Sequence, residues 1–126
     1  MARITEDYIS FETAKLLIKK GFDYNSEYES YYTLGGIIVY FADRPQDLNI
    51  APRVTLQMAM KWLREVHNLE IYPYHDNTSI YNSKWWVEII EYPNSVSEYE
   101  SGKDEEFDTY EEACEAAIKY CLENLI

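Results

Sequence analysis

Glycine and proline are scarce in this sequence, with only four of each among 126 residues. Their scarcity excludes a collagen-like chain and a low-complexity disordered chain, because both need far more of these two residues. Apolar residues make up 47% of the chain instead. A chain of this length buries roughly two-thirds of its unfolded surface on folding, and we therefore predict a single domain over residues 1–126.

Long apolar runs are missing as well. No stretch approaches the roughly 18 apolar residues of a membrane-spanning helix, and residues 1–7 have no apolar core like that of a targeting signal. We therefore expect a soluble, cytoplasmic protein without a membrane partner. The two cysteines, Cys114 and Cys121, lie two turns apart on one face of a predicted helix. Their Cα atoms are then about 10 Å apart, beyond disulfide reach, so we expect two small buried side chains.

Basic residues are few, because 11 Lys and Arg stand against 23 Asp and Glu in a chain of net charge −12. Direct binding of nucleic acid needs clustered Lys and Arg, so we expect no direct nucleic-acid partner, and no anionic membrane surface either. The acids concentrate after Asn94, where ten of them accompany two lysines. In this acidic run, the interaction candidates are Glu98, Glu100, Asp104, Glu105, Glu106 and Asp108.

Three interpretations of the acidic run stay open. It is a solvated loop with acids at a helix N-terminus, where the helix dipole favours them. It is a docking surface for a basic partner, such as a nuclease or another nucleic-acid enzyme. Or it binds divalent metal loosely, although the alternating oxygen ligands and the central glycine of an EF-hand are absent.

Catalytic motifs are also absent. The sequence has no Gly-x-Ser-x-Gly, no phosphate-binding glycine loop, no Cys-x-x-Cys and no His-Glu-x-x-His. Of the two histidines, His67 falls on the apolar face of a predicted helix, as a structural side chain does. His75 with Asp76 could act as a base with its orienting carboxylate, so a small hydrolase stays as an alternative. We otherwise expect a non-enzymatic protein without cofactor or metal.

Hydrophobic periodicity predicts three helices. The first spans residues 11–20, with Ser10 as N-cap and Gly21 after its last turn. The second follows Thr55 and ends at Asn68, and its apolar stripe is Leu56, Ala59, Met60, Leu63, Val66 and His67. The third spans residues 110 to about 125 and opens on a capping box of Thr109 and Glu112.

The segments between these helices predict two hairpins. Residues 28–33 pair with 37–41, and the first of these has the alternation of a half-exposed edge strand. Residues 69–74 pair with 84–92, and Pro73 indicates that the former is short or lies at an edge. Residues 95–101 are a candidate for one more edge strand.

The order of these elements indicates the fold class. We predict a two-layer α+β fold in the order α-ββ-α-ββ-α, with a mostly antiparallel sheet and helices packed on one face. In the second hairpin, Trp85, Val87 and Ile89 should face the helices. Lys84, Trp86, Glu88 and Ile90 should then face the other way.

Aromatic side chains are abundant in the predicted hairpins, since the chain has 13 tyrosines and three tryptophans. If one sheet face packs on the helices, the opposite face carries tyrosine and tryptophan, which are enriched at protein interfaces. The alternative is that tyrosine is simply a good strand former. Our candidates for an interface are Tyr28, Tyr32, Trp86 and Tyr92, through which we predict a homodimer.

Two resemblances bear on origin and partner. Residues 6–22, 55–67 and 110–123 are similar to a group of small proteins from prophages and mobile elements of gut Bacteroidetes. This resemblance covers most of the chain, and it implies a phage or mobile-element origin and no site residues. The step from a strand at 85–91 to a helix opening with Thr109-Tyr110-Glu111-Glu112-Ala113 resembles HicB-type antitoxins, although a long acidic insertion precedes the helix here. That resemblance implies a basic ribonuclease as partner.

Together these observations predict a non-enzymatic protein-interaction module of phage or mobile-element origin, with a protein partner or a second copy of the chain. One alternative is an acidic nucleic-acid mimic or antitoxin-like inhibitor of a basic nucleic-acid enzyme. The other, from a different class, is the small hydrolase using His75 and Asp76.

Overall fold

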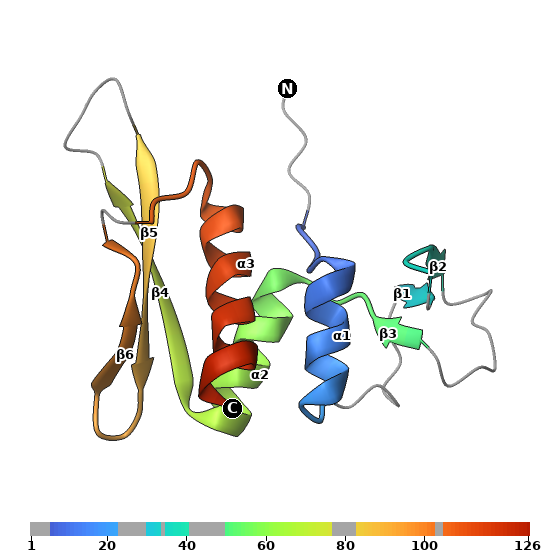
Figure 1. The fold of residues 1–126 in the computed structure, drawn as a ribbon, viewed down its shortest axis with the longest axis horizontal. Helices are drawn as coiled ribbons and strands as arrows, with labels where there is room; N and C mark the ends of the chain where they lie inside the picture. The colour runs from blue at the N-terminus through green and yellow to red at the C-terminus, as the bar shows by residue number, and fades with distance from the viewer. Residues whose placement is uncertain (1–5, 23–29, 34, 41–49, 77–82, 103–104) are drawn as a thin grey trace. The chain divides into compact units, whose positions relative to one another are not determined.

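The computed structural model describes residues 6–22, 30–33, 35–40, 50–76, 83–102 and 105–126 (Figure 1). Its elements follow in the order α1 (Phe11–Lys19), β1 (Ser30–Thr33), β2 (Ile38–Tyr40), β3 (Ile50–Pro52), α2 (Leu56–His67), β4 (Leu69–Asp76), β5 (Lys84–Glu91), β6 (Val96–Glu100), α3 (Tyr110–Tyr120) and η3 (Cys121–Leu125). The α+β class and its antiparallel pairing are confirmed.

The strands form two three-stranded sheets, ordered β2-β1-β3 and β4-β5-β6. Strand β3 has no counterpart in the sequence prediction, because it is only three residues long and ends in a proline. The chain divides into two compact units, Met1–Ala59 and Met60–Ile126. A single domain over residues 1–126 stays a prediction.

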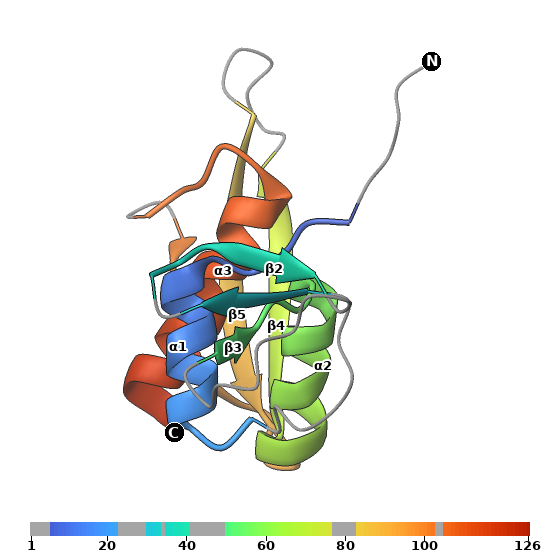
Figure 2. The same cartoon turned by 90° about the vertical axis from the view of Figure 1, so that its right-hand side faces the viewer.

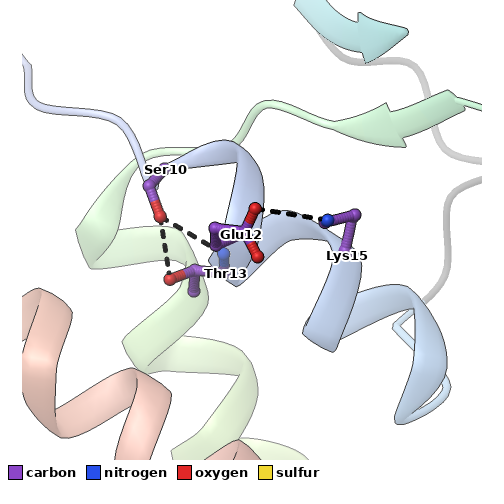
Figure 3. Close-up of polar contacts among 4 residues, drawn as sticks. All are labelled: Ser10, Glu12, Thr13 and Lys15. Atoms are coloured by element: carbon purple, nitrogen blue, oxygen red, sulfur yellow. Dashed lines mark hydrogen bonds and ion pairs between the residues drawn. The ribbon is translucent and has the colours of Figure 1, made fainter. Parts of the chain in front are cut away.

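Helix α1 begins as predicted. Ser10 is its N-cap in an extended conformation, and its Oγ accepts a hydrogen bond from the backbone N–H of Thr13 at 3.2 Å (Figure 3). The Ser10 hydroxyl also donates to Thr13 Oγ1 at 3.1 Å. One turn along, Lys15 Nζ lies 3.2 Å from Glu12 Oε1, an exposed ion pair that contributes little to stability.

The end of α1 is closed by a Schellman motif. Gly21 has φ +94°, and its N–H donates to the carbonyl of Ile18, while the N–H of Phe22 donates to that of Leu17. A side chain is strained at such a φ, which explains the glycine. The turn folds Phe22 back, and its side chain is buried.

Strand β1 lies in the centre of its sheet, between β2 and β3, which corrects the predicted edge position (Figure 2). Ser30, Tyr31 and Tyr32 are all buried there. The hydroxyl of Tyr32 donates to the carbonyl of Ile9 at 2.7 Å, and its ring lies 5.6 Å from that of Phe11. The alternating pattern was misleading because β3, the second neighbour of β1, is too short to recognise in the sequence.

Helix α2 is capped by Thr55, whose Oγ1 accepts from the N–H of Met58, and Asn68 follows the helix with φ 59°. Its predicted stripe is buried at Leu56, Ala59, Met60 and Leu63. The prediction that Val66 belongs to this buried stripe is wrong, because its side chain is 57% exposed. It lies in the last turn at the border of the stripe, where sequence periodicity separates buried from exposed positions least well.

The second sheet has β5 at its centre, paired with β4 from Leu69↔Glu91 to Asp76↔Lys84. Strand β4 is an edge strand, as Pro73 indicates, but its eight residues make it longer than predicted. The candidate strand at residues 95–101 is confirmed as β6, with a bulge between Ile89 and Ile90 of its partner. Helix α3 packs on β4 and β5 (Figure 1).

Helix α3 has the predicted N-cap, since Thr109 Oγ1 accepts from the N–H of Glu112 at 3.1 Å. The Glu112 carboxylate reaches back to the N–H of Asp108 rather than to that of Thr109, which is one residue beyond the usual capping box. The helix continues through the π-helical turn η3. Cys114 and Cys121 are fully buried and unbridged, as expected.

Leu63 and Val66 provide a test of the packing of α2. Leu63 is fully buried, whereas Val66, one turn later, is 57% exposed. We expect Leu63→Ala to lower the free energy of unfolding by about 2–5 kcal/mol, because it leaves a cavity. Val66→Ala should change it by less than about 0.5 kcal/mol. Urea unfolding of both variants measures the difference, and equal effects would contradict this orientation of α2.

Candidate interaction surface

The two faces of the second sheet differ in what they contact. Val87 and Ile89 are fully buried on the side of α3, and the Trp85 ring meets Tyr110 of α3 edge-on at 5.4 Å. Because strand residues alternate between faces, Trp86 and Glu88 project from the opposite side. We call this side the outer face and define it by Tyr72, Tyr74, Trp86, Glu88 and Tyr92.

A stacked aromatic pair lies on the outer face. Tyr74 and Trp86 are direct partners in the β4–β5 register, and their rings stack at 4.3 Å between centroids with an interplanar angle of 16°. Tyr74 is 39% exposed, and Trp86 is half-buried. Such a cross-strand pair stabilises the sheet and at the same time presents aromatic surface to the surroundings.

Glu88 lies beside this pair and is held by two hydroxyl groups. Tyr74 donates to its Oε1 at 3.4 Å, and Ser97 donates to its Oε2 at 2.9 Å. The nearby carboxylate adds to burial in raising the pKa of the Tyr74 phenol, since it disfavours the phenolate. The carboxylate therefore has a fixed position next to the stacked rings.

A second pair of tyrosines completes the outer face. The hydroxyls of Tyr72 and Tyr92 are 2.6 Å apart and share a hydrogen bond. That bond is the main reason why the pKa of Tyr72 rises to about 12. With its pKa raised, the Tyr72 phenol stays neutral at physiological pH, and its partner Tyr92 is 39% exposed.

The predicted aromatic candidates do not all share this face. Trp86 and Tyr92 lie on it. Tyr32 belongs to the first sheet and is only 8% exposed, so the prediction that it is a surface residue is wrong. Tyr28 lies outside the described residues. Tyr72 and Tyr74 were not among the predicted candidates. Together with Glu70 they occupy every second position of the predicted strand, which places all three on one face.

The acidic candidates are spread over several local contacts. Glu100 faces Glu88 in the β5–β6 register, Glu105 accepts from the Tyr99 hydroxyl at 2.8 Å, and Asp108 pairs with Lys84. Glu106 is exposed. Asp104 lies outside the described residues. Most of the acids described here therefore serve the sheet and the start of α3 rather than one continuous row.

Glu98 interacts with a second carboxyl group, that of Glu91. It lies at the bulge of β6, and its carboxyl shares a hydrogen bond with that of Glu91. This bond, with burial and the charge of Glu91, raises the pKa of Glu98 above 4.5. Two carboxyls can share a hydrogen bond only while one of them is protonated.

Stability should therefore depend on pH through Glu98. A raised pKa in the folded state stabilises the fold at low pH, and this contribution is lost as the pH rises through the raised value. We expect Glu98→Gln to raise the thermal midpoint near pH 7 relative to the wild type, with no such gain near pH 4. Glu65→Gln, at an exposed site on α2, is the control. An equal shift of Glu98→Gln at both pH values would contradict the shared proton.

The histidine considered for hydrolysis has a different neighbour from the expected one. His75 Nε2 hydrogen-bonds Ser83 Oγ, and its ring stacks on Trp85 at 4.6 Å. Strand alternation directs Asp76 to the opposite face of β4. Ser83 was not named from the sequence, because it is eight residues away across the hairpin.

The described residues contain neither a group of three or more His, Cys, Asp or Glu suited to holding a metal ion nor a helix that could cross a membrane. Burial raises the pKa of Cys114 to about 11 and that of Cys121 to about 12, so both thiols stay protonated. No family model, curated protein or solved structure matches this chain.

Proposed function

We propose that this protein is a non-enzymatic protein-interaction module that binds its partner through the outer face. The observation that carries the proposal is the exposed aromatic group on the side of the sheet that α3 leaves uncovered. Tyrosine and tryptophan supply large contact areas at low entropic cost, and they dominate the energetics of protein interfaces. A phage or mobile-element origin remains part of the proposal.

The alternatives draw less support from the geometry. A nucleic-acid mimic needs carboxylates spaced along a continuous row, whereas Glu105 and Asp108 are engaged in separate contacts. A hydrolase needs a base with its orienting group, whereas alternation directs His75 and Asp76 to opposite faces of β4. An interaction through the aromatic outer face needs neither a row of carboxylates nor a catalytic pair.

Capture of partners from a lysate of the source cells tests the module. The immobilised full chain should retain a partner that Trp86→Ala loses, because the substitution removes the largest aromatic surface of the outer face. Val66→Ala, at an exposed apolar site on helix α2, should retain it. If Trp86→Ala captures the same proteins as the wild type while keeping its fold, the outer face is not the binding surface.

Homodimer formation through the outer face should depend on salt. Two copies that meet face to face bring Glu88 and Glu100 of each toward the other, and the chain carries a net charge of −12. Salt screens this repulsion beyond about 10 Å near 0.1 M, so self-association should strengthen as salt rises. Sedimentation at low and high salt measures it. A monomer under both conditions at tens of micromolar would contradict the dimer.

A further inference from the structure

The outer face combines two features that recognise the same chemical group. The Tyr74–Trp86 stack offers aromatic rings, and the fixed Glu88 carboxylate lies beside it. A guanidinium group is planar and always charged, stacks on aromatic rings, and pairs with carboxylates through a fork of N–H donors. We propose that the outer face takes an arginine-bearing segment of a partner protein, an inference that rests on the interaction module proposed above.

The charge of this face supports a cationic occupant. Glu88 and Glu100 are direct partners in the β5–β6 register, and like charges at such positions are unfavourable. In the described part of the chain, Arg64 lies 3.4 Å from Glu70, and Lys84 of β5 pairs with Asp108. No described Lys or Arg forms an ion pair with Glu88 or Glu100. An incoming arginine relieves this repulsion.

A second copy of the chain fits the same face less well. Self-association places the carboxylates of two outer faces against each other, whereas an arginine-bearing segment brings the opposite charge. The two occupants have opposite salt dependence, because screening weakens attraction between unlike charges and repulsion between like ones. Salt dependence therefore tells them apart.

Fluorescence anisotropy with a short labelled peptide of alternating Arg and Gly tests the inference on the full chain. The matched probe is the same peptide with citrulline, a neutral isostere, in place of arginine. We expect the arginine peptide to bind and the citrulline peptide not to bind, with affinity falling as salt rises. Absence of arginine-peptide binding, or equal binding of both peptides, would overturn the cationic assignment.

Variants then locate the binding on the outer face. Glu88→Gln keeps an oxygen that accepts from Ser97 or Tyr74, and it should weaken arginine-peptide binding about fivefold. Trp86→Ala should weaken it by a similar factor, about fivefold, through the lost ring. Glu65→Gln removes the same charge at an exposed site on α2 and should change affinity by less than about twofold. Thermal unfolding confirms that each variant is folded.

The outcomes separate this inference from the interaction module itself. If Glu65→Gln weakens binding as much as Glu88→Gln, the peptide follows net charge and the arginine site is overturned. If Trp86→Ala abolishes lysate capture while Glu88→Gln and salt leave it unchanged, the module stands and its occupant is not cationic. Weaker capture with both variants, together with the loss of about fivefold in peptide affinity expected for each, supports the inference.

Discussion

The packing of one side of β5 against α3 is the constraint that decides which side chains of the second unit are buried and which are exposed. Val87 and Ile89 are fully buried, and Ala113, Cys114, Ala117 and Ile118 of α3 are buried too. Strand residues alternate, so burying these two side chains commits Trp86 and Glu88 to the other side. The same packing keeps the cysteine thiols protonated and unreactive. The packing of the core therefore decides which side chains of β5 form the outer face.

The outer face is organised by cross-strand pairs rather than by residues adjacent in sequence. Tyr74 meets Trp86 by register, and Tyr72 meets Tyr92 through their hydroxyls. Ser97 of β6 then fixes the carboxylate of Glu88. Aromatic rings next to an oriented carboxylate have a chemical preference for guanidinium, which a plain tyrosine-rich strand lacks. In the proposed arginine site, specificity depends on the position of Glu88 as much as on aromatic area.

Acidic residues near β6 illustrate how charge is divided between fold and surface. Asp108 pairs with Lys84, and Glu112 supports the first turn of α3. Glu98 and Glu91 share a hydrogen bond that disfavours ionisation of Glu98. Glu88 and Glu100 face each other in the β5–β6 register, and no described Lys or Arg forms an ion pair with either. The composition alone treats these acids alike, although only the last pair leaves negative charge on the outer face next to aromatic rings.

The sequence by itself determined the local features of this protein. Ser10, Thr55 and Thr109 cap the helices as predicted, and Gly21 ends α1, because a cap depends on residues three or four positions apart. Strand alternation placed Val87 and Ile89 inside, because it too depends only on residues close in sequence, here two positions apart. Even the Glu112 side chain kept its role at the start of α3, displaced by one residue.

Only the tertiary structure decided which distant segments meet. Tyr32 is buried because β3 covers the second edge of β1 and Ile9 accepts its hydroxyl, neither of which local pattern reveals. His75 meets Ser83, and Tyr72 meets Tyr92, because the register of β4 against β5 brings them together. A sheet is assembled from segments far apart in the chain. Its neighbours are therefore selected by packing and register, which a single sequence read along its length does not encode position by position.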